Sequence, residues 1–79
     1  MCGIVGLWNQ HRQAGPDIFV ALTAMQHRGK ESGGIATYDK GQIDDHVAMG
    51  DMAQVFMNKK ASSLKGRVGI GHVRYSNTG

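Results

Sequence analysis

Hydrophobic and polar positions divide the first third of the chain into a strand and a helix. Residues 3–8, GIVGLW, form a short apolar run that predicts a buried strand. A polar loop follows, and Pro16 then suits the first turn of a helix, where its missing N–H costs nothing. The next apolar residues recur at helical spacing: Ile18, Phe19, Leu22 and Met25. We therefore predict a helix over residues 16–28, which Gly29 can end in a left-handed conformation.

The middle of the chain predicts a hairpin and then short helical turns. Residues 33–39, GGIATYD, have strand character, and KGQ is typical of a hairpin turn into a second strand over 43–49. Residues 50–66 are expected to hold one or two helical turns. Three residues of this segment are expected to be buried: Val55, Phe56 and Leu64.

The last strand is predicted over residues 67–76, RVGIGHVRYS. The order strand, helix, two strands, helical turns and strand indicates one α+β unit. If the first strand lies beside the last, Cys2 comes close to the HVRYS end. Four strands and one good helix leave a sheet edge and a sheet face poorly covered, so we expect these 79 residues to be part of a longer protein.

Composition excludes several classes of function. The net charge of +3 comes from scattered Lys and Arg, whereas nucleic-acid binders cluster their charge on one face, so we expect no nucleic-acid partner. No apolar stretch approaches the ~20 residues that span a bilayer. The first residues lack the basic region and hydrophobic core of a signal sequence, so we expect no export. The single cysteine has no disulfide partner, which fits a reducing cytoplasm.

That cysteine, Cys2, directly follows the start methionine. If Met1 is removed, the thiol and a free α-amine belong to one residue. An α-amine of ordinary pKa, about 7.7–8.0, is partly neutral near physiological pH and can take the proton of the thiol. The thiolate then attacks a carbonyl carbon, without the separate histidine of a triad. Position alone, however, favours a plainer interpretation, in which Cys2 is a small apolar residue that begins a strand.

The last strand carries a second candidate. Arg74 can offer a planar pair of donors to a carboxylate, and His72 alternates onto the same face. Taken alone, Arg74 is more typical of a surface arginine on an edge strand. Taken alone, His72 is more typical of a hydrogen-bonded structural histidine. We assign no role to His11 and His46, which we expect to be exposed to solvent.

The segment QHRGKESGG, residues 26–34, is the third stretch of interest. Its glycines permit tight turns close to a ligand or to another strand. His27, Arg28 and Glu31 could form a hydrogen-bonded cluster that supports such a turn. The spacing of a nucleotide-binding glycine loop is missing, so we reject nucleotide binding through this motif.

Together, MCGIVG, QHRGKESGGIATYD and IGHVRYSNTG resemble the glutamine-hydrolysing domain of the class II amidotransferases, which are N-terminal-nucleophile hydrolases. The resemblance covers nearly all of residues 1–79. Within the class, HRG and HVRYS look most like the amidophosphoribosyltransferases. Glucosamine-6-phosphate synthase, which typically shows YRG and HTRWATHG, is the alternative branch.

The resemblance implies a fold and a set of roles. The chain would supply part of a four-layer αββα sandwich. Cys2 would form a γ-glutamyl thioester and release ammonia from glutamine, with its own α-amine as the general base. Arg74 would hold the α-carboxylate of glutamine. Asn77 stands where the family usually has Thr, and would contact the substrate with altered geometry.

Other parts implied by the resemblance have no counterpart in the chain. The Asn-Gly oxyanion hole and the Asp that anchors the substrate amine cannot be assigned, so we expect the 79 residues alone to be inactive. Phosphoribosyl pyrophosphate and Mg²⁺ would bind a separate phosphoribosyltransferase domain, and we expect no cofactor or metal in this segment. The full-length enzyme would be a homo-oligomer that makes phosphoribosylamine, the first step of purine synthesis. A non-catalytic truncated remnant is the remaining alternative.

Overall fold

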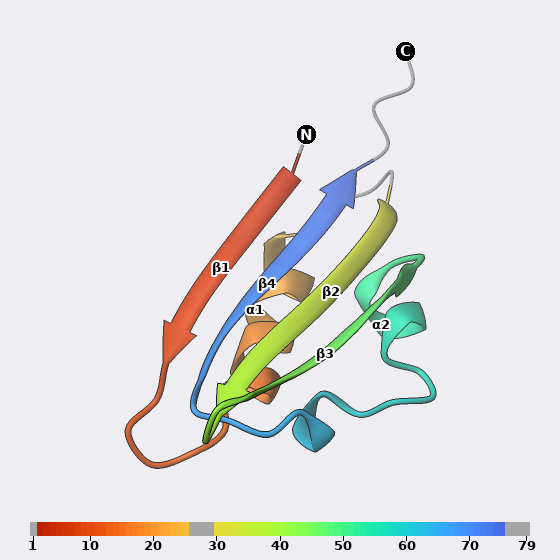
Figure 1. The fold of residues 1–79 in the computed structure, drawn as a ribbon. Coiled ribbons are helices and arrows are strands. Elements are labelled where there is room, and N and C mark those ends of the chain that lie inside the picture. The colour runs from red at the N-terminus through yellow and green to blue at the C-terminus, as the bar shows by residue number, and fades with distance from the viewer. Residues whose placement is uncertain (1, 26–29, 76–79) are drawn as a thin grey trace.

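The computed structural model describes residues 2–25 and 30–75, with only the backbone of residues 30, 31 and 75 (Figure 1). The predicted order of elements is confirmed. The elements are β1 (Cys2–Trp8), α1 (Gly15–Met25), β2 (Lys30–Asp39), β3 (Gln42–Met49), α2 (Met52–Val55), a 3-10 turn (Ala61–Ser63) and β4 (Val68–Tyr75). The predicted helix end at residue 28 and its Gly29 cap lie outside the described residues.

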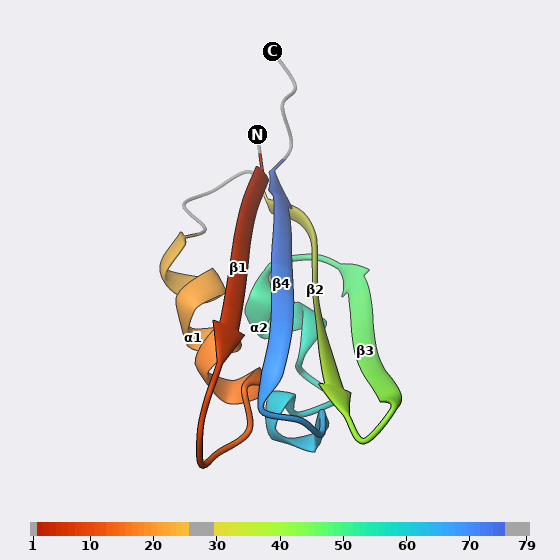
Figure 2. The same cartoon turned by 60° about the vertical axis from the view of Figure 1, so that its left-hand side comes forward.

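The four strands form one antiparallel sheet in the order β1-β4-β2-β3. The first strand therefore pairs with the last, as expected from the sequence, and β4 lies between β1 and β2 (Figures 1 and 2). Lys40 and Gly41 both have positive φ in the turn that joins β2 to β3, which suits the tight hairpin predicted at KGQ.

Both helices cover the same face of the sheet (Figure 2). Ile18 and Leu22 of α1 are fully buried there. The helix approaches β4 closely because glycine occupies the facing position: a Cβ on Gly71 would lie 2.7 Å from Leu22 Cδ1. From the α2 side, the core includes the residues predicted to be buried: Val55, Phe56 and Leu64.

The short helix α2 begins at a complete capping box. The Asp51 side chain accepts a hydrogen bond from the Gln54 backbone N–H at 2.9 Å, and the Gln54 side chain accepts one from the Asp51 N–H. These two bonds satisfy backbone donors that the start of a helix leaves unpaired. Among the described residues, no helix is both long and apolar enough to cross a membrane.

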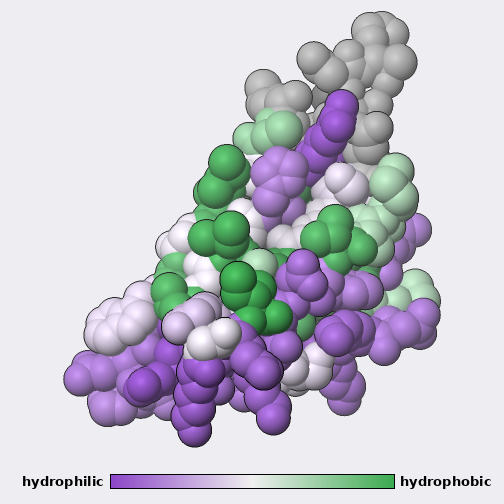
Figure 3. All heavy atoms as spheres, in the orientation of Figure 1, coloured by the Kyte–Doolittle hydropathy of each residue, from purple (hydrophilic) through white to green (hydrophobic). Residues whose placement is uncertain are grey.

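The other face of the sheet is covered by no described element, and we call it the open face. Ile4 is 72% exposed and Trp8 is 67% exposed on it, so the expectation that residues 3–8 form a fully buried strand is wrong for this chain. Their side chains alternate away from the helices, whereas Val5 and Leu7 pack against the core. Figure 3 shows hydrophobic side chains gathered over the middle of this face and hydrophilic ones along its lower rim.

One expectation about histidine also needs correction. His46 is half-buried on the helix side of β3, not exposed to solvent. Its ring nitrogen Nε2 lies 2.7 Å from the carbonyl oxygen of Val55, to which it donates, and the ring stands edge-on to Phe56. The imidazole thus fastens the end of α2 to the sheet. His11 is exposed, as expected.

Candidate functional site

The pairing of β1 with β4 sets Cys2 directly opposite Arg74. Residues directly opposite in antiparallel strands project to the same face, with Cβ atoms about 4.5–5.5 Å apart. Cys2 is an exposed free thiol, and Arg74 is also exposed. On the other side of β4, Ser32 is paired with Arg74 as well. The open face therefore carries a row of three polar residues from three strands, Cys2, Arg74 and Ser32.

The alternation along β4 explains why Arg74 projects from this face. Gly69, Gly71 and Val73 are buried towards the helices. The residues between them, including His72 and Arg74, must then project from the opposite face. The sequence prediction that His72 and Arg74 share a face is confirmed.

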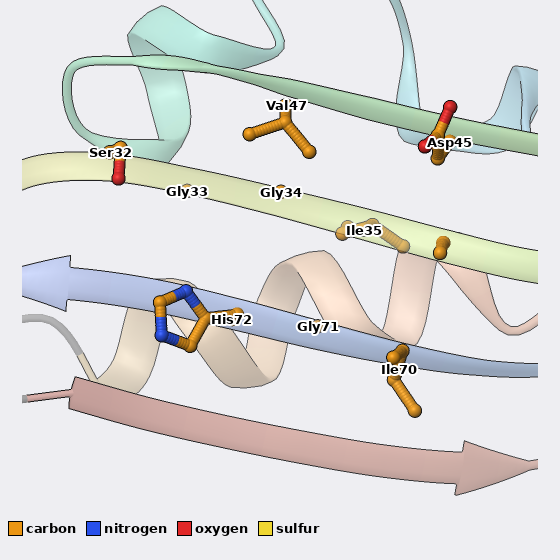
Figure 4. Close-up of a pocket in the computed structure, with 10 residues that line it drawn as sticks. Ser32, Gly33, Gly34, Ile35, Asp45, Val47, Ile70, Gly71 and His72 are labelled. Atoms are coloured by element: carbon orange, nitrogen blue, oxygen red, sulfur yellow. The ribbon is translucent and has the colours of Figure 1, made fainter.

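A shallow pocket of about 160 Å³ begins beside this row (Figure 4). Ser32 and His72 line the pocket at the end close to Arg74, and Val47 and Ile70 supply much of its apolar wall. Ser32 is a residue that the sequence analysis did not single out. Ser32 could be connected with the site only through its pairing with Arg74, and the sequence does not show that β2 and β4 are neighbours.

The sequence favoured a hydrogen-bonded structural histidine at position 72. In the structure His72 is exposed, and no described residue makes a hydrogen bond to its ring. Its partners in the neighbouring strands are Ile4 on β1 and Gly34 on β2. That alternative is therefore wrong for the described part of the chain.

Gly33 and Gly34 lie inside β2, so the tight turn predicted around them does not form there. Their missing side chains instead permit close packing against neighbours. A Cβ on Gly33 would lie 2.7 Å from the Met52 sulfur, and one on Gly34 would lie 2.5 Å from Val47 Cγ2. Gly33 thus gives room to α2 and Gly34 gives room to β3, so these two glycines serve close packing and not a turn.

Some predicted residues lie outside the described part of the structure. Asn77 is one of them, and so is the proposed cluster at His27 and Arg28, together with the side chain of Glu31. No three His, Cys, Asp or Glu side chains among the described residues come together as metal ligands. What the described site offers chemically is an exposed thiol beside a guanidinium, a group whose planar pair of donors matches a carboxylate.

Known proteins are similar in sequence to nearly the whole chain. The amidophosphoribosyltransferase of Methanothermobacter thermautotrophicus is 51% identical over 99% of the chain, and that of Bacillus subtilis is 38% identical over 99%. The chain spans only 17% and 16% of these two relatives. No family model matches the chain.

Two solved structures have a similar fold. Glutamine phosphoribosylpyrophosphate amidotransferase from B. subtilis, complexed with ADP and GMP, gives a TM-score of 0.84 at 35% identity and covers 99% of the chain. A structure described as the allosteric regulatory enzyme of purine biosynthesis gives 0.78 at 36% identity over 95%. The chain covers 17% and 16% of these structures, respectively. The architecture is that of an α+β N-terminal-nucleophile hydrolase domain, of which the chain supplies one sheet and its helices.

Proposed function

We propose that this chain, which is homologous to the N-terminal region of the amidophosphoribosyltransferases, supplies the nucleophile and a carboxylate anchor for glutamine hydrolysis. Cys2 is the nucleophile and Arg74 binds the α-carboxylate. All the relatives and structures named above are of the phosphoribosyl type or of purine biosynthesis, which favours that branch over glucosamine-6-phosphate synthase.

The chemistry follows from the two groups that Cys2 carries once Met1 is removed. The α-amine takes the thiol proton, and the thiolate sulfur attacks the γ-carbonyl carbon of glutamine. As the carbon–nitrogen bond breaks, the α-ammonium returns that proton to the leaving nitrogen, which departs as ammonia. Water then adds to the thioester, the carbon–sulfur bond breaks, and glutamate and the thiol are released.

The observation that carries the proposal is the pairing of Cys2 with Arg74. Two methylene groups and the α-carbon separate the γ-carbonyl carbon of glutamine from its carboxylate, a length comparable to one strand spacing of about 4.8 Å. A substrate attacked by Cys2 on β1 can thus reach with its carboxylate over β4, where Arg74 projects. Arginine is suited to this role because its planar fork matches a carboxylate in two hydrogen bonds.

The rest of the reaction belongs to a longer protein. We propose that ammonia released here is used with phosphoribosyl pyrophosphate and Mg²⁺ at a separate domain to make phosphoribosylamine. The described residues do not fit a metal site, since no cluster of ligands forms among them, and no step at Cys2 needs one. Asn77 is proposed as a further contact to glutamine. The apolar open face, with Ile4 and Trp8 exposed, supports packing against the second sheet of the sandwich.

The test is Cys2→Ala in the full-length protein that carries this segment. We expect glutamine-dependent synthesis of phosphoribosylamine to fall to background while synthesis from added ammonia continues, because only the ammonia source is lost. Loss of both activities together would contradict the division of labour. If glutamine-dependent synthesis survives, Cys2 is not the nucleophile. The 79 residues alone should hydrolyse no glutamine.

A further inference from the structure

The imidazole of His72 stands on the open face beside the candidate site. His72 precedes Arg74 by two residues on β4, so the two side chains share a face at adjacent positions. Figure 4 shows the ring leaning towards the C-terminal end of β4, which is the end where Arg74 is paired with Cys2. The ring is thus directed towards the row of Cys2, Arg74 and Ser32.

Its surroundings leave the hydrogen-bonding groups of the ring available. The residues paired with it across the sheet, Ile4 and Gly34, offer no polar side chain, and no described residue makes a hydrogen bond to it. The pocket that it lines is mainly apolar, with Val47 and Ile70 in its wall. An imidazole always carries at least one N–H donor, so the ring of His72 can donate a hydrogen bond to a ligand at this end of the pocket.

We propose that His72 is a second carboxylate-binding residue, which donates a hydrogen bond to the α-carboxylate of the amino-acid substrate together with Arg74. This inference rests on the proposed function of Cys2 and Arg74. A substrate that extends from Cys2 across β4 brings its carboxylate to the side of the strand where the pocket begins. There the Arg74 fork can hold the carboxylate while the imidazole donates to one of its oxygens. His72 thereby selects a free α-amino acid over its amide.

The experiment compares two substrates in the full-length enzyme, glutamine and glutamine α-amide, which lacks the carboxylate. For His72→Phe we expect the KM for glutamine to rise about tenfold or more, with kcat changed less than about twofold, because a hydrogen bond to a charged group is lost. With the α-amide, kcat/KM should be the same in the variant and in the parent enzyme. His72→Asn keeps an N–H donor and should recover part of the loss.

Val68→Ala is the matched control, because Val68 lies on the same strand and face, six residues before Arg74, and does not line the pocket beside His72. Its KM should not change. Ammonia-dependent synthesis reports whether each variant is folded. If His72→Phe loses this activity, glutamine and glutamine α-amide are compared with His72→Asn instead, and that comparison tests the role of His72. An unchanged KM, or an equal loss with both substrates, would overturn the inference about His72. If the parent enzyme does not hydrolyse glutamine at all, the proposed function itself has failed.

Discussion

Cys2 and Arg74 lie at opposite ends of the chain and directly opposite each other in the sheet. The pairing depends on β4 entering the sheet beside β1, between it and β2. A shift of one residue between β1 and β4 would turn one of the two side chains towards the helices, because successive residues alternate in face. The relative position of the two groups is therefore set by the backbone hydrogen bonds of the sheet.

Arg74→Ala is expected to raise the KM for glutamine by about 10- to 100-fold in the full-length enzyme, because hydrogen bonds to the charged carboxylate are lost. The value of kcat should change much less, since the carboxylate lies several bonds away from the carbonyl carbon at which the proposed reaction takes place. Arg74→Lys should fall between, because lysine keeps the charge but not the planar fork. Steady-state kinetics with glutamine and with ammonia measure both effects.

Arg67 provides the control for this series. It is an exposed arginine just before β4, at the far end of the strand from Arg74, and it donates to the carbonyl oxygen of Gln10. Arg67→Ala should leave the KM for glutamine unchanged. An Arg74→Ala variant with the same KM as the parent enzyme would remove Arg74 from the substrate site.

The sequence was sufficient to predict the order of elements, because each element carries a local signal. Pro16 marks the start of the helix and KGQ marks the hairpin turn. Glycines at 33 and 34 were more difficult to interpret, since glycine is common both in turns and at close contacts between elements. Only the contacts with Met52 and Val47 decide between the two uses.

The candidate site was predicted in part. Cys2 and Arg74 could be selected by their chemistry and by resemblance, and the sequence order allowed β1 and β4 to be neighbours. The position of Ser32 beside Arg74 could not be predicted, because a strand register is set by long-range pairing. The exposure of Ile4 and Trp8 was not predicted for a related reason: the sequence of an apolar strand does not show which face of the sheet the helices cover.

Gly71→Ala should destabilise the fold by about 1–3 kcal/mol, because the new methyl group would press on Ile18 and Leu22 of α1. Urea unfolding of the 79-residue chain, followed by circular dichroism, measures the change. Gly6→Ala is the control, since a Cβ at Gly6 meets no atom within 4 Å. Equal stability of both variants would show that α1 does not pack closely on β4.

Thr37→Val should cost about 1–2 kcal/mol of unfolding free energy. The Thr37 hydroxyl is buried and donates to the carbonyl oxygen of Lys65 at 2.6 Å, and valine keeps the shape but removes the donor. Thr23→Val is the matched control, because the Thr23 hydroxyl donates to a carbonyl oxygen, that of Phe19, at an exposed position. The control should change stability by less than about 0.5 kcal/mol in the same urea assay.

The α-amine of Cys2 can be tested separately from its thiol. A lysine inserted between Met1 and Cys2 keeps the thiol but converts the α-amine into an amide, because the start methionine is removed only before a small residue. An amide nitrogen is not a base, so glutamine-dependent turnover of the full-length enzyme should fall at least about 100-fold. Ammonia-dependent synthesis should be retained, which shows that the enzyme is folded.

As a control, a protease site inserted directly before Cys2 should restore glutamine-dependent turnover once cleavage makes Cys2 the first residue. Full turnover before cleavage would mean that another group takes the thiol proton.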